Sequence, residues 1–312
     1  MSTDKNSPWI PLNFLALPEE KSNLKNSRVV LLPVPYDSTT SYRTGARDGP
    51  MAILRASYNL EDYDHELDFD VSQVGIHTTP FLEPHMGGPR QMVERIEEAV
   101  HTLATPDKIV GLLGGEHTIS VGAVKAMATR YPDLSVLYLD AHGDLRDQYM
   151  DTPWSHATVA RRLQEICPLV QIGVRSISQE ERDFIRQKGT PTFFWDSDDP
   201  ELPVLDRLLP LLTQEVYISI DLDVLDPSIM AAVGTPEPGG MSWSQITWLI
   251  RKVAEKRRIV GFDVTELSPG EGPTACSYTA AKLVYKLIGY STLWQGKESA
   301  ESVLRSSALP QG

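Results

Sequence analysis

Runs of apolar residues alternate along the chain with stretches in which apolar and polar residues recur at helical spacing. Several of the apolar runs lack an exposed face, which is typical of strands in a parallel sheet covered by helices on each side. The expected strands are SRVVLLPVPYD (27–37), KIVGLLGG (108–115), SVLYLD (135–140), VQIGVR (170–175), TFFWD (192–196), EVYISIDLDVL (215–225) and RIVGFDVTEL (258–267). Helices are expected over 88–105, 119–131, 156–166, 179–188, 203–212, 243–256 and 278–287. This alternation predicts an α/β fold with a mostly parallel sheet and right-handed crossovers.

The whole chain, residues 1–312, is expected to form one domain, because neither an internal repeat nor a low-complexity linker divides it. Residues 1–25 and 295–312 are expected to be a peripheral extension and a frayed tail. Apolar residues make up 41% of the chain, and none of their runs reaches the length of a membrane span. No secretory signal is recognised and only two cysteines are present, so a cytoplasmic protein without a disulfide framework is expected.

The net charge of −13 argues against a nucleic-acid-binding surface and is compatible with a small cationic substrate. Most of this charge is expected to be ordinary solvated surface. The composition therefore argues against nucleic acid as a partner but does not identify the substrate.

Four of the expected strands end in acidic residues or histidines. These four segments are GLLGGEHT (111–118), LYLDAHGDLRD (137–147), ISIDLDVLDPS (218–228) and GFDVTELSP (261–269). In open α/β sheets, ligands bind beyond the carboxyl ends of the strands, so four such segments can build one site.

The spacing within these segments indicates a metal centre. Residues two apart in an extended chain point to the same side. The candidate ligands are two histidines and four aspartates: His117, Asp140, His142, Asp144, Asp221 and Asp223. Imidazole with carboxylate suits Mn²⁺, and less well Zn²⁺ or Ni²⁺. Six ligands exceed the needs of one tetrahedral ion, whereas two ions about 3.5–4 Å apart with shared carboxylates would use them all.

Each segment alone has a simpler interpretation. A lone histidine after a strand is usually a turn or core residue, and DLDVLDP could be a strand end followed by a turn at Asp226-Pro227. Several buried carboxylates without cations would, however, cost several kcal/mol. No lysine lies within the four segments, and only Arg146 is a nearby cation, so a metal pair is the more economical interpretation.

The segments GGEHT, DAHGDLRD, SIDLDVLDPS and the later GTPEPGG together resemble the ureohydrolases, the family of arginase and agmatinase. The resemblance extends from PVPYDSTTSYRTGARDGPMAIL (33–54) to CSYTAAKLVYKL (276–287). It implies a three-layer α/β/α arginase-like fold with a mainly parallel eight-stranded sheet. It also implies two Mn²⁺ ions per subunit and a homo-oligomer, a trimer or a hexamer.

The resemblance assigns roles to individual residues. One ion would be held by His117, Asp140, Asp144 and Asp221, and the other by Asp140, His142, Asp221 and Asp223, with Asp140 and Asp221 bridging. His156 in WSHAT matches a proton-shuttling histidine, although it could instead be a surface or capping residue beside Ser155. Glu266 matches the glutamate that pairs with the guanidinium group, and Thr235 matches a threonine at that end of the pocket.

The chemistry implied is hydrolysis of a guanidinium group. Two divalent ions lower the pKa of a bridging water, so that hydroxide can attack the guanidinium carbon near neutral pH. Glu266 would aim that carbon through a planar pair of hydrogen bonds. Asp144 would pass a proton to the departing amine, His156 would exchange protons with solvent, and Asp263 would support the site without touching substrate.

The sequence defines the part of the substrate beyond the guanidinium group, here called its tail, less well. DAHGDLRDQY, WSHAT, GVRS (173–176) and TELSP (265–269) resemble agmatinases, which favours hydrolysis of agmatine to putrescine and urea, a step of polyamine biosynthesis. Arg146 stands where arginases have an asparagine that reads the α-carboxylate of arginine. Arg146 could attract a carboxylate tail, or could pair with Asp147 or Asp151. The stretch Ala231-Ala232-Val233 departs from the Pro-Gly-Thr-like sequence usual in the family.

Guanidinobutyrate, guanidinopropionate, guanidine, arginine and formiminoglutamate therefore stay open as alternative substrates. An alternative of another class is a non-catalytic, metal-stabilised binding protein. The presence of all six ligands with His156 and Glu266 argues against it.

Overall fold

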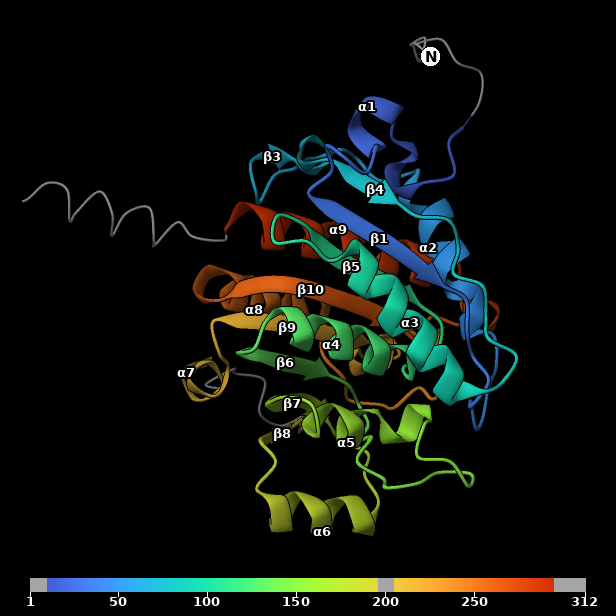
Figure 1. Cartoon of the computed structure of the whole chain (residues 1–312), viewed down its shortest axis with the longest axis vertical. Coiled ribbons are helices and arrows are strands. Elements are labelled where there is room, and N and C mark those ends of the chain that lie inside the picture. Colours follow the sequence, from blue (N-terminus) through green and yellow to red (C-terminus); the bar gives the residue numbers. More distant parts are fainter. Residues whose placement is uncertain (1–9, 196–204, 295–312) are drawn as a thin grey trace, which may run out of the picture.

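A parallel sheet of eight strands forms the centre of the protein (Figure 1). The structure, a computed structural model, describes residues 10–195 and 205–294. The strand order is β4-β1-β5-β10-β9-β6-β7-β8, and every neighbouring pair is parallel. The strands are β1 (Val29–Val34), β4 (Ile76–Thr78), β5 (Ile109–Gly114), β6 (Leu134–Leu139), β7 (Leu169–Val174), β8 (Thr192–Phe194), β9 (Glu215–Asp221) and β10 (Arg258–Thr265). The strands β1, β5, β6 and β7 are buried over their whole length, as their apolar sequences predict.

Helices cover both faces of this sheet and give the molecule three layers (Figure 1). One face is covered by α3 (Pro89–Leu103), α4 (Ile119–Arg130) and α5 (Val159–Gln164), and the other by α2 (Gly49–Ser57), α8 (Trp243–Lys256) and α9 (Ala275–Leu293). Each face has its own buried apolar cluster, so the sheet separates two hydrophobic cores. The expected α/β/α fold with a parallel eight-stranded sheet is confirmed.

The remaining elements lie around this framework. They are α1 (Glu19–Ser22), α6 (Gln179–Lys188), α7 (Leu205–Leu208), the antiparallel pair β2 (Tyr63–Asp64) and β3 (Phe69–Asp70), and the 3₁₀ helices η1 (Phe14–Ala16), η2 (Ala46–Asp48), η3 (Val71–Val74), η4 (His156–Thr158), η5 (Leu209–Leu211), η6 (Leu222–Val224) and η7 (Pro269–Glu271). Phe14 of η1 is fully buried in the core. Within the described residues, no helix is both long and apolar enough to cross a membrane.

Several element boundaries differ from the sequence-based expectation. The strand β4 and the helix α2 were not expected, and α9 is longer at both ends than 278–287. The helix expected over 156–166 begins as the 3₁₀ helix η4 and continues as α5. The helix expected over 203–212 is a short α7 followed by η5, with 203–204 outside the described residues. The tail at 295–312 also lies outside them.

A buried ion-pair cluster ties the β2–β3 hairpin to α9. The Lys286 ammonium lies 2.8 Å from Asp64 Oδ1 and 2.6 Å from Glu66 Oε2. The Tyr290 hydroxyl donates to the same Glu66 oxygen over 2.9 Å. Asp64 and Lys286 are both almost completely buried, and their charges are neutralised within this cluster, to which Lys282 adds a longer contact with Asp64 at 3.6 Å.

Candidate active site at the carboxyl edge of the sheet

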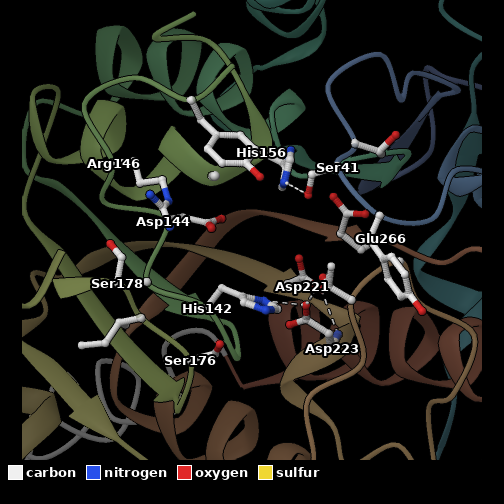
Figure 2. A pocket seen from close by; sticks show the side chains of 18 of the residues that line it. Ser41, His142, Asp144, Arg146, His156, Ser176, Ser178, Asp221, Asp223 and Glu266 are labelled. Carbon is white, nitrogen blue, oxygen red and sulfur yellow. Dashed lines mark hydrogen bonds and ion pairs between the residues drawn. The ribbon is translucent and has the colours of Figure 1, made fainter. Parts of the chain in front are cut away.

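Four neighbouring strands in the middle of the sheet bring the expected site residues to one place. The strands β5, β10, β9 and β6 are adjacent, and at their carboxyl ends stand His117, Glu266, Asp221 and Asp140, respectively. The 3₁₀ helix η6 after β9 adds Asp223, and the loop after β6 adds His142 and Asp144 (Figure 2). The structure therefore gathers the six candidate ligands and Glu266 at the edge where open α/β sheets bind ligands.

The turn after β5 requires glycine. A Cβ atom on Gly115 would lie 1.9 Å from the carbonyl oxygen of Tyr36, which also accepts the Glu116 amide hydrogen over 2.7 Å. Only a residue without a side chain lets the two backbone segments approach this closely. This contact sets the position of Glu116 and His117.

His117 is held so that one ring nitrogen faces the carboxylates. Its Nε2 lies 2.9 Å from the Ser219 hydroxyl, which in turn donates to Asp263 Oδ1 over 2.8 Å. Since the serine proton goes to Asp263, the serine oxygen accepts Nε2–H, and the lone pair of His117 is left on Nδ1. Nδ1 lies 3.0 Å from Asp140 Oδ2 and 3.3 Å from Asp221 Oδ2.

Backbone amides orient three of the carboxylates, and each of these carboxylates uses only its Oδ1 atom for this contact. Asp140 Oδ1 accepts from the His142 amide over 2.6 Å, and Asp221 Oδ1 accepts from the Asp223 amide over 2.8 Å. Asp223 Oδ1 accepts from the Ala141 amide over 3.1 Å. The Oδ2 atoms are thereby left facing the site, and Asp140 Oδ2 is buried without a hydrogen-bond donor. An unpaired buried oxygen of this kind fits a ligand of a cation.

Two overlapping groups of side chains could hold metal ions. The first is His117, Asp140 and Asp221, and the second is Asp140, His142 and Asp223; in each group the ligand atoms lie within 4.8 Å of one another. Asp140 belongs to both groups, as expected of a shared ligand. The residues present therefore fit a pair of divalent cations.

Asp144 and the second contact of Asp221 are less direct than the family resemblance implies. Asp144 Oδ2 lies 3.6 Å from His117 Nδ1 and accepts the Tyr138 hydroxyl over 2.6 Å. Asp221 belongs to the first group but not to the second. The structure places both residues beside the shared Asp140, and their part in binding ions stays a prediction.

The electrostatics of the cluster also favour bound cations. Burial and the neighbouring charges of Asp223 and Asp140 raise the pKa of Asp221 well above its usual value. Burial and the charge of Asp140 do the same to the pKa of Asp144. Buried carboxylates that lie close together tend to stay protonated, because their negative charges repel one another. Bound divalent cations would neutralise these charges and favour the ionised form.

Glu266 stands beside the first group with one oxygen anchored. Its Oε1 accepts from the His117 amide over 2.7 Å, and its side chain reaches the pocket together with Gly234 and Thr235. Burial and the charge of Glu116 raise the pKa of Glu266 to about 8. Thr235 lies 3.4 Å from Asp223 Oδ2. A carboxylate so placed can accept N–H groups from a planar cation in the pocket.

Two of the site residues have a left-handed backbone. The φ angle is 50° at Asp144 and 65° at Glu266. This region costs a non-glycine residue on the order of 1–3 kcal/mol, and such residues cluster at functional sites.

His156 lies on the opposite wall of the pocket from the metal-ligand groups (Figure 2). Its Nδ1 is 3.3 Å from the Thr39 hydroxyl and its Nε2 is 3.4 Å from the Ser41 hydroxyl, while the Tyr149 ring packs edge-on against the imidazole. Burial and the charge of His142 lower the pKa of His156 to about 4. At the start of η4 the Ser155 amide donates to the Thr158 hydroxyl over 3.0 Å, so this turn is closed without the His156 side chain.

The pocket has a volume of about 330 Å³, at the small end of ligand cavities. Its outer wall includes Arg146, whose guanidinium lies over the Tyr149 ring at 5.3 Å from the ring centre. Asp147 pairs with Arg161 and Arg162, at 3.5 Å and 2.7 Å, and not with Arg146. Within residues 10–195 and 205–294, Arg146 has no ion-pair partner.

Comparison with known proteins identifies the family. The sequence profile of the arginase family matches residues 27–289. The chain belongs to the arginase family. The expected ureohydrolase resemblance and the expected hydrolase class are thereby confirmed.

Individual members of the arginase family show the same relationship over nearly the full chain. The chain is 40% identical over 290 residues to the N(1)-aminopropylagmatine ureohydrolase of Thermus thermophilus, with 92% of this chain and 98% of that protein covered. It is 38% identical over 291 residues to the protein of the same name from Synechocystis sp., with 90% and 94% covered. The solved structure of the agmatine ureohydrolase of Thermoplasma volcanium superimposes with a TM-score of 0.79 at 32% identity, covering 88% of this chain and 92% of that one.

Several residues of this arginase-family site were not singled out from the sequence. Tyr138 and Ser219 stand two residues before Asp140 and Asp221 on the same strands, so strand alternation gave a signal for them. Thr39 and Ser41 lie in a loop that is far along the chain from the metal-ligand segments, and Glu116 was not distinguished from its neighbour His117. The contacts of Thr39 with His156 and Glu116, and of Ser41 with His156, depend on tertiary structure, for which the local sequence gave no signal.

Proposed function

We propose that this arginase-family protein hydrolyses the guanidinium group of a linear guanidino-amine, releasing urea, with agmatine as the first candidate substrate and putrescine as its product. The observation that carries the proposal is the pair of metal-ligand groups that share Asp140, with Glu266 beside them at the same pocket. The motifs around Asp144, His156 and Glu266, which resemble agmatinases, favour agmatine.

Each group of side chains would carry out a separate part of the reaction. Two divalent cations bound by the six ligands would supply hydroxide near neutral pH, because they lower the pKa of water. Glu266, fixed through Oε1 by the His117 amide, would accept the N–H groups of the guanidinium with its free oxygen and hold the carbon in place. Asp144, held by Tyr138, would pass a proton to the departing amine nitrogen. His156, on the opposite wall of the pocket, would exchange protons between the pocket and solvent.

N(1)-aminopropylagmatine is a second candidate substrate. The relatives that are 38% and 40% identical to this chain carry that substrate in their names. Both candidates are cations without a carboxylate, in keeping with the acidic character of the chain.

Finer properties of the protein belong to the same proposal. We propose Mn²⁺ as the resident ion, a homo-oligomer in the cytoplasm, and His117, Asp140, His142, Asp144, Asp221 and Asp223 as the ligand set. The mixture of imidazole and carboxylate supports manganese over softer ions.

Urea release measured side by side on four compounds tests the substrate. Full-length protein loaded with Mn²⁺ would be assayed with agmatine, N(1)-aminopropylagmatine, guanidinobutyrate and arginine. We expect the highest kcat/KM with one of the two amines. A preference for guanidinobutyrate or arginine would contradict the amine-tail assignment and would instead make Arg146 a candidate partner of a carboxylate. Absence of urea from all four, with two ions bound per chain, would favour a binding protein.

A further inference from the structure

A buried carboxylate beside the site has no part in the mechanism proposed above. This residue is Glu116, which directly precedes His117 in the chain and is completely buried. Both of its oxygens are taken by one residue: the Thr39 amide donates to Oε2 over 2.7 Å, and the Thr39 hydroxyl donates to Oε1 over 2.8 Å. This two-point contact fixes Thr39 and the loop that carries it.

The Thr39 hydroxyl also meets His156 twice. It accepts the His156 amide hydrogen over 3.1 Å and lies 3.3 Å from the ring nitrogen Nδ1. A hydroxyl has one proton to donate and two lone pairs to accept with. Since the proton goes to Glu116, the hydroxyl can only accept from His156, and the ring must carry its hydrogen on Nδ1.

A neighbouring hydroxyl does not change this assignment. Thr118 Oγ1 lies 3.4 Å from Thr39 Oγ1, and the Thr118 side chain also hydrogen-bonds to Glu116. The same carboxylate can therefore receive both hydroxyl protons. The Thr39 lone pairs stay available for His156.

The other ring nitrogen is then left as an acceptor at the pocket. Nε2 lies 3.4 Å from the hydroxyl of Ser41, which lines the pocket and is exposed. A neutral imidazole with its hydrogen on Nδ1 can take a proton only at Nε2. The tautomer therefore decides whether the nitrogen facing the pocket can accept a proton from it.

We propose that Thr39 and Glu116 are positioning residues that hold His156 with its hydrogen on Nδ1, so that the accepting nitrogen Nε2 faces the pocket. This inference rests on the proposed function, in which His156 exchanges protons with solvent. Neither residue lines the pocket, and both act through the orientation and the tautomer of His156.

Glu116→Gln is the sharpest test, because it changes the direction of the hydrogen bonds while keeping the shape. The glutamine oxygen must face the Thr39 amide, since that donor cannot turn away. The glutamine NH₂ group then faces the Thr39 hydroxyl, which is left to donate its proton to His156 Nδ1. We expect the hydrogen of the imidazole to move to Nε2.

Nitrogen NMR of the histidine rings reads this change directly. The full chain, labelled with ¹⁵N-histidine and loaded with diamagnetic Zn²⁺, would be measured at pH 9, and His156→Asn would identify the signal. We expect Nδ1 to be the protonated nitrogen in the wild type and the unprotonated one in Glu116→Gln. A wild-type ring protonated on Nε2, or a ring unchanged by Glu116→Gln, would overturn the inference.

Kinetics supply a second measurement on the Mn²⁺-loaded enzyme. Thr39→Val removes the hydroxyl, and we expect kcat to fall by about 10- to 100-fold with KM nearly unchanged. Thr39→Ser keeps the hydroxyl and should restore most of kcat. Thr44→Val, the same exchange at an exposed position of the same loop, is the matched control and should behave like the wild type. Equal kcat for Thr39→Val and the wild type would overturn the positioning role.

The two measurements separate failure of this inference from failure of the proposed function. The NMR result does not depend on turnover. If the wild type releases urea from no guanidine compound, the function fails while the tautomer is still measured. If urea is released but the tautomer differs from that described, only the inference fails.

Discussion

Single side chains in this site are fixed mainly by backbone amides. Asp140, Asp221 and Asp223 each give one oxygen to an N–H group and turn the other toward the site, and Glu266 does the same through the His117 amide. A carboxylate anchored in this way loses little further freedom when a ligand arrives. The alternation of ligand residues along the strands was readable from the sequence, whereas these amide contacts were not, because they depend on loop conformation.

Glu266→Gln tests the guanidinium contact. The amide oxygen can still accept from the His117 backbone, but the charge that pairs with the guanidinium is lost. A hydrogen bond to a charged group contributes about 1.5–3 kcal/mol, so kcat/KM for the preferred amine should fall about 10- to 100-fold. Elemental analysis should still find two ions per chain. A variant with wild-type kcat/KM would show that Glu266 does not contact the guanidinium.

At the scale of elements, buried strands were predicted well and short or partly exposed elements were not. The strands β5 and β6 are buried over their whole length and rich in Val, Ile and Leu, so the apolar run was sufficient to find them. The strand β4 has three residues, of which only Ile76 is buried, and this is too short for a periodic signal. Boundaries such as the start of α9 depend on packing against other layers.

The contact between the β2–β3 hairpin and α9 gives a stability prediction. Lys286→Met leaves the buried Asp64 with only its longer contact to Lys282, at 3.6 Å, so the free energy of unfolding at pH 7 should fall by up to about 3 kcal/mol, the lower end for a broken buried pair. Lys252→Met breaks a half-exposed pair with Glu255 on α8 and should cost only about 0–1 kcal/mol. Chemical denaturation of the full chain measures both.

The loss from Lys286→Met should depend on pH. Burial would raise the pKa of Asp64 and Glu66, but hydrogen bonds from Lys286, together with those from Arg251 and Tyr290 to Glu66, outweigh it and lower both below their usual values of 3.8 and 4.5. A carboxyl whose pKa is lowered by folding stabilises the protein above that usual value, and this contribution is lost as the pH falls through the folded pKa. The difference between variant and wild type should therefore shrink below about pH 4.5. A difference that stayed constant down to acid pH would contradict the ion pair as its cause.

The whole molecule concentrates negative charge at one edge of its sheet. Four aspartates and Glu266 meet there in a chain of net charge −13, and burial raises the pKa of several of them. Ions that bind only the folded state stabilise it by about 2.7 kcal/mol at a hundredfold excess over Kd. Folding and metal binding are therefore expected to be coupled.

Thermal unfolding with and without Mn²⁺ tests this coupling. Removal of metal by a chelator should lower Tm by about 5 °C or more, and added Mn²⁺ should restore it. Asp140→Ala, which removes the ligand shared by both groups, should abolish most of the shift, whereas the exposed Asp133→Ala should keep it. An equal Mn²⁺-induced shift in Asp140→Ala and the wild type would contradict the shared-ligand assignment.

The left-handed backbone at Asp144 and Glu266 has a consequence for engineering this protein. Glycine adopts that conformation at no steric cost, so exchanging either residue for glycine would relieve backbone strain and also remove a carboxylate to which we assign a role in catalysis. The relief of backbone strain opposes the loss of the contacts that these side chains make, and we expect both glycine variants to lose turnover. Backbone strain and the proposed chemistry thus make opposite demands at positions 144 and 266, so a mutant library intended to keep activity should leave both residues unchanged.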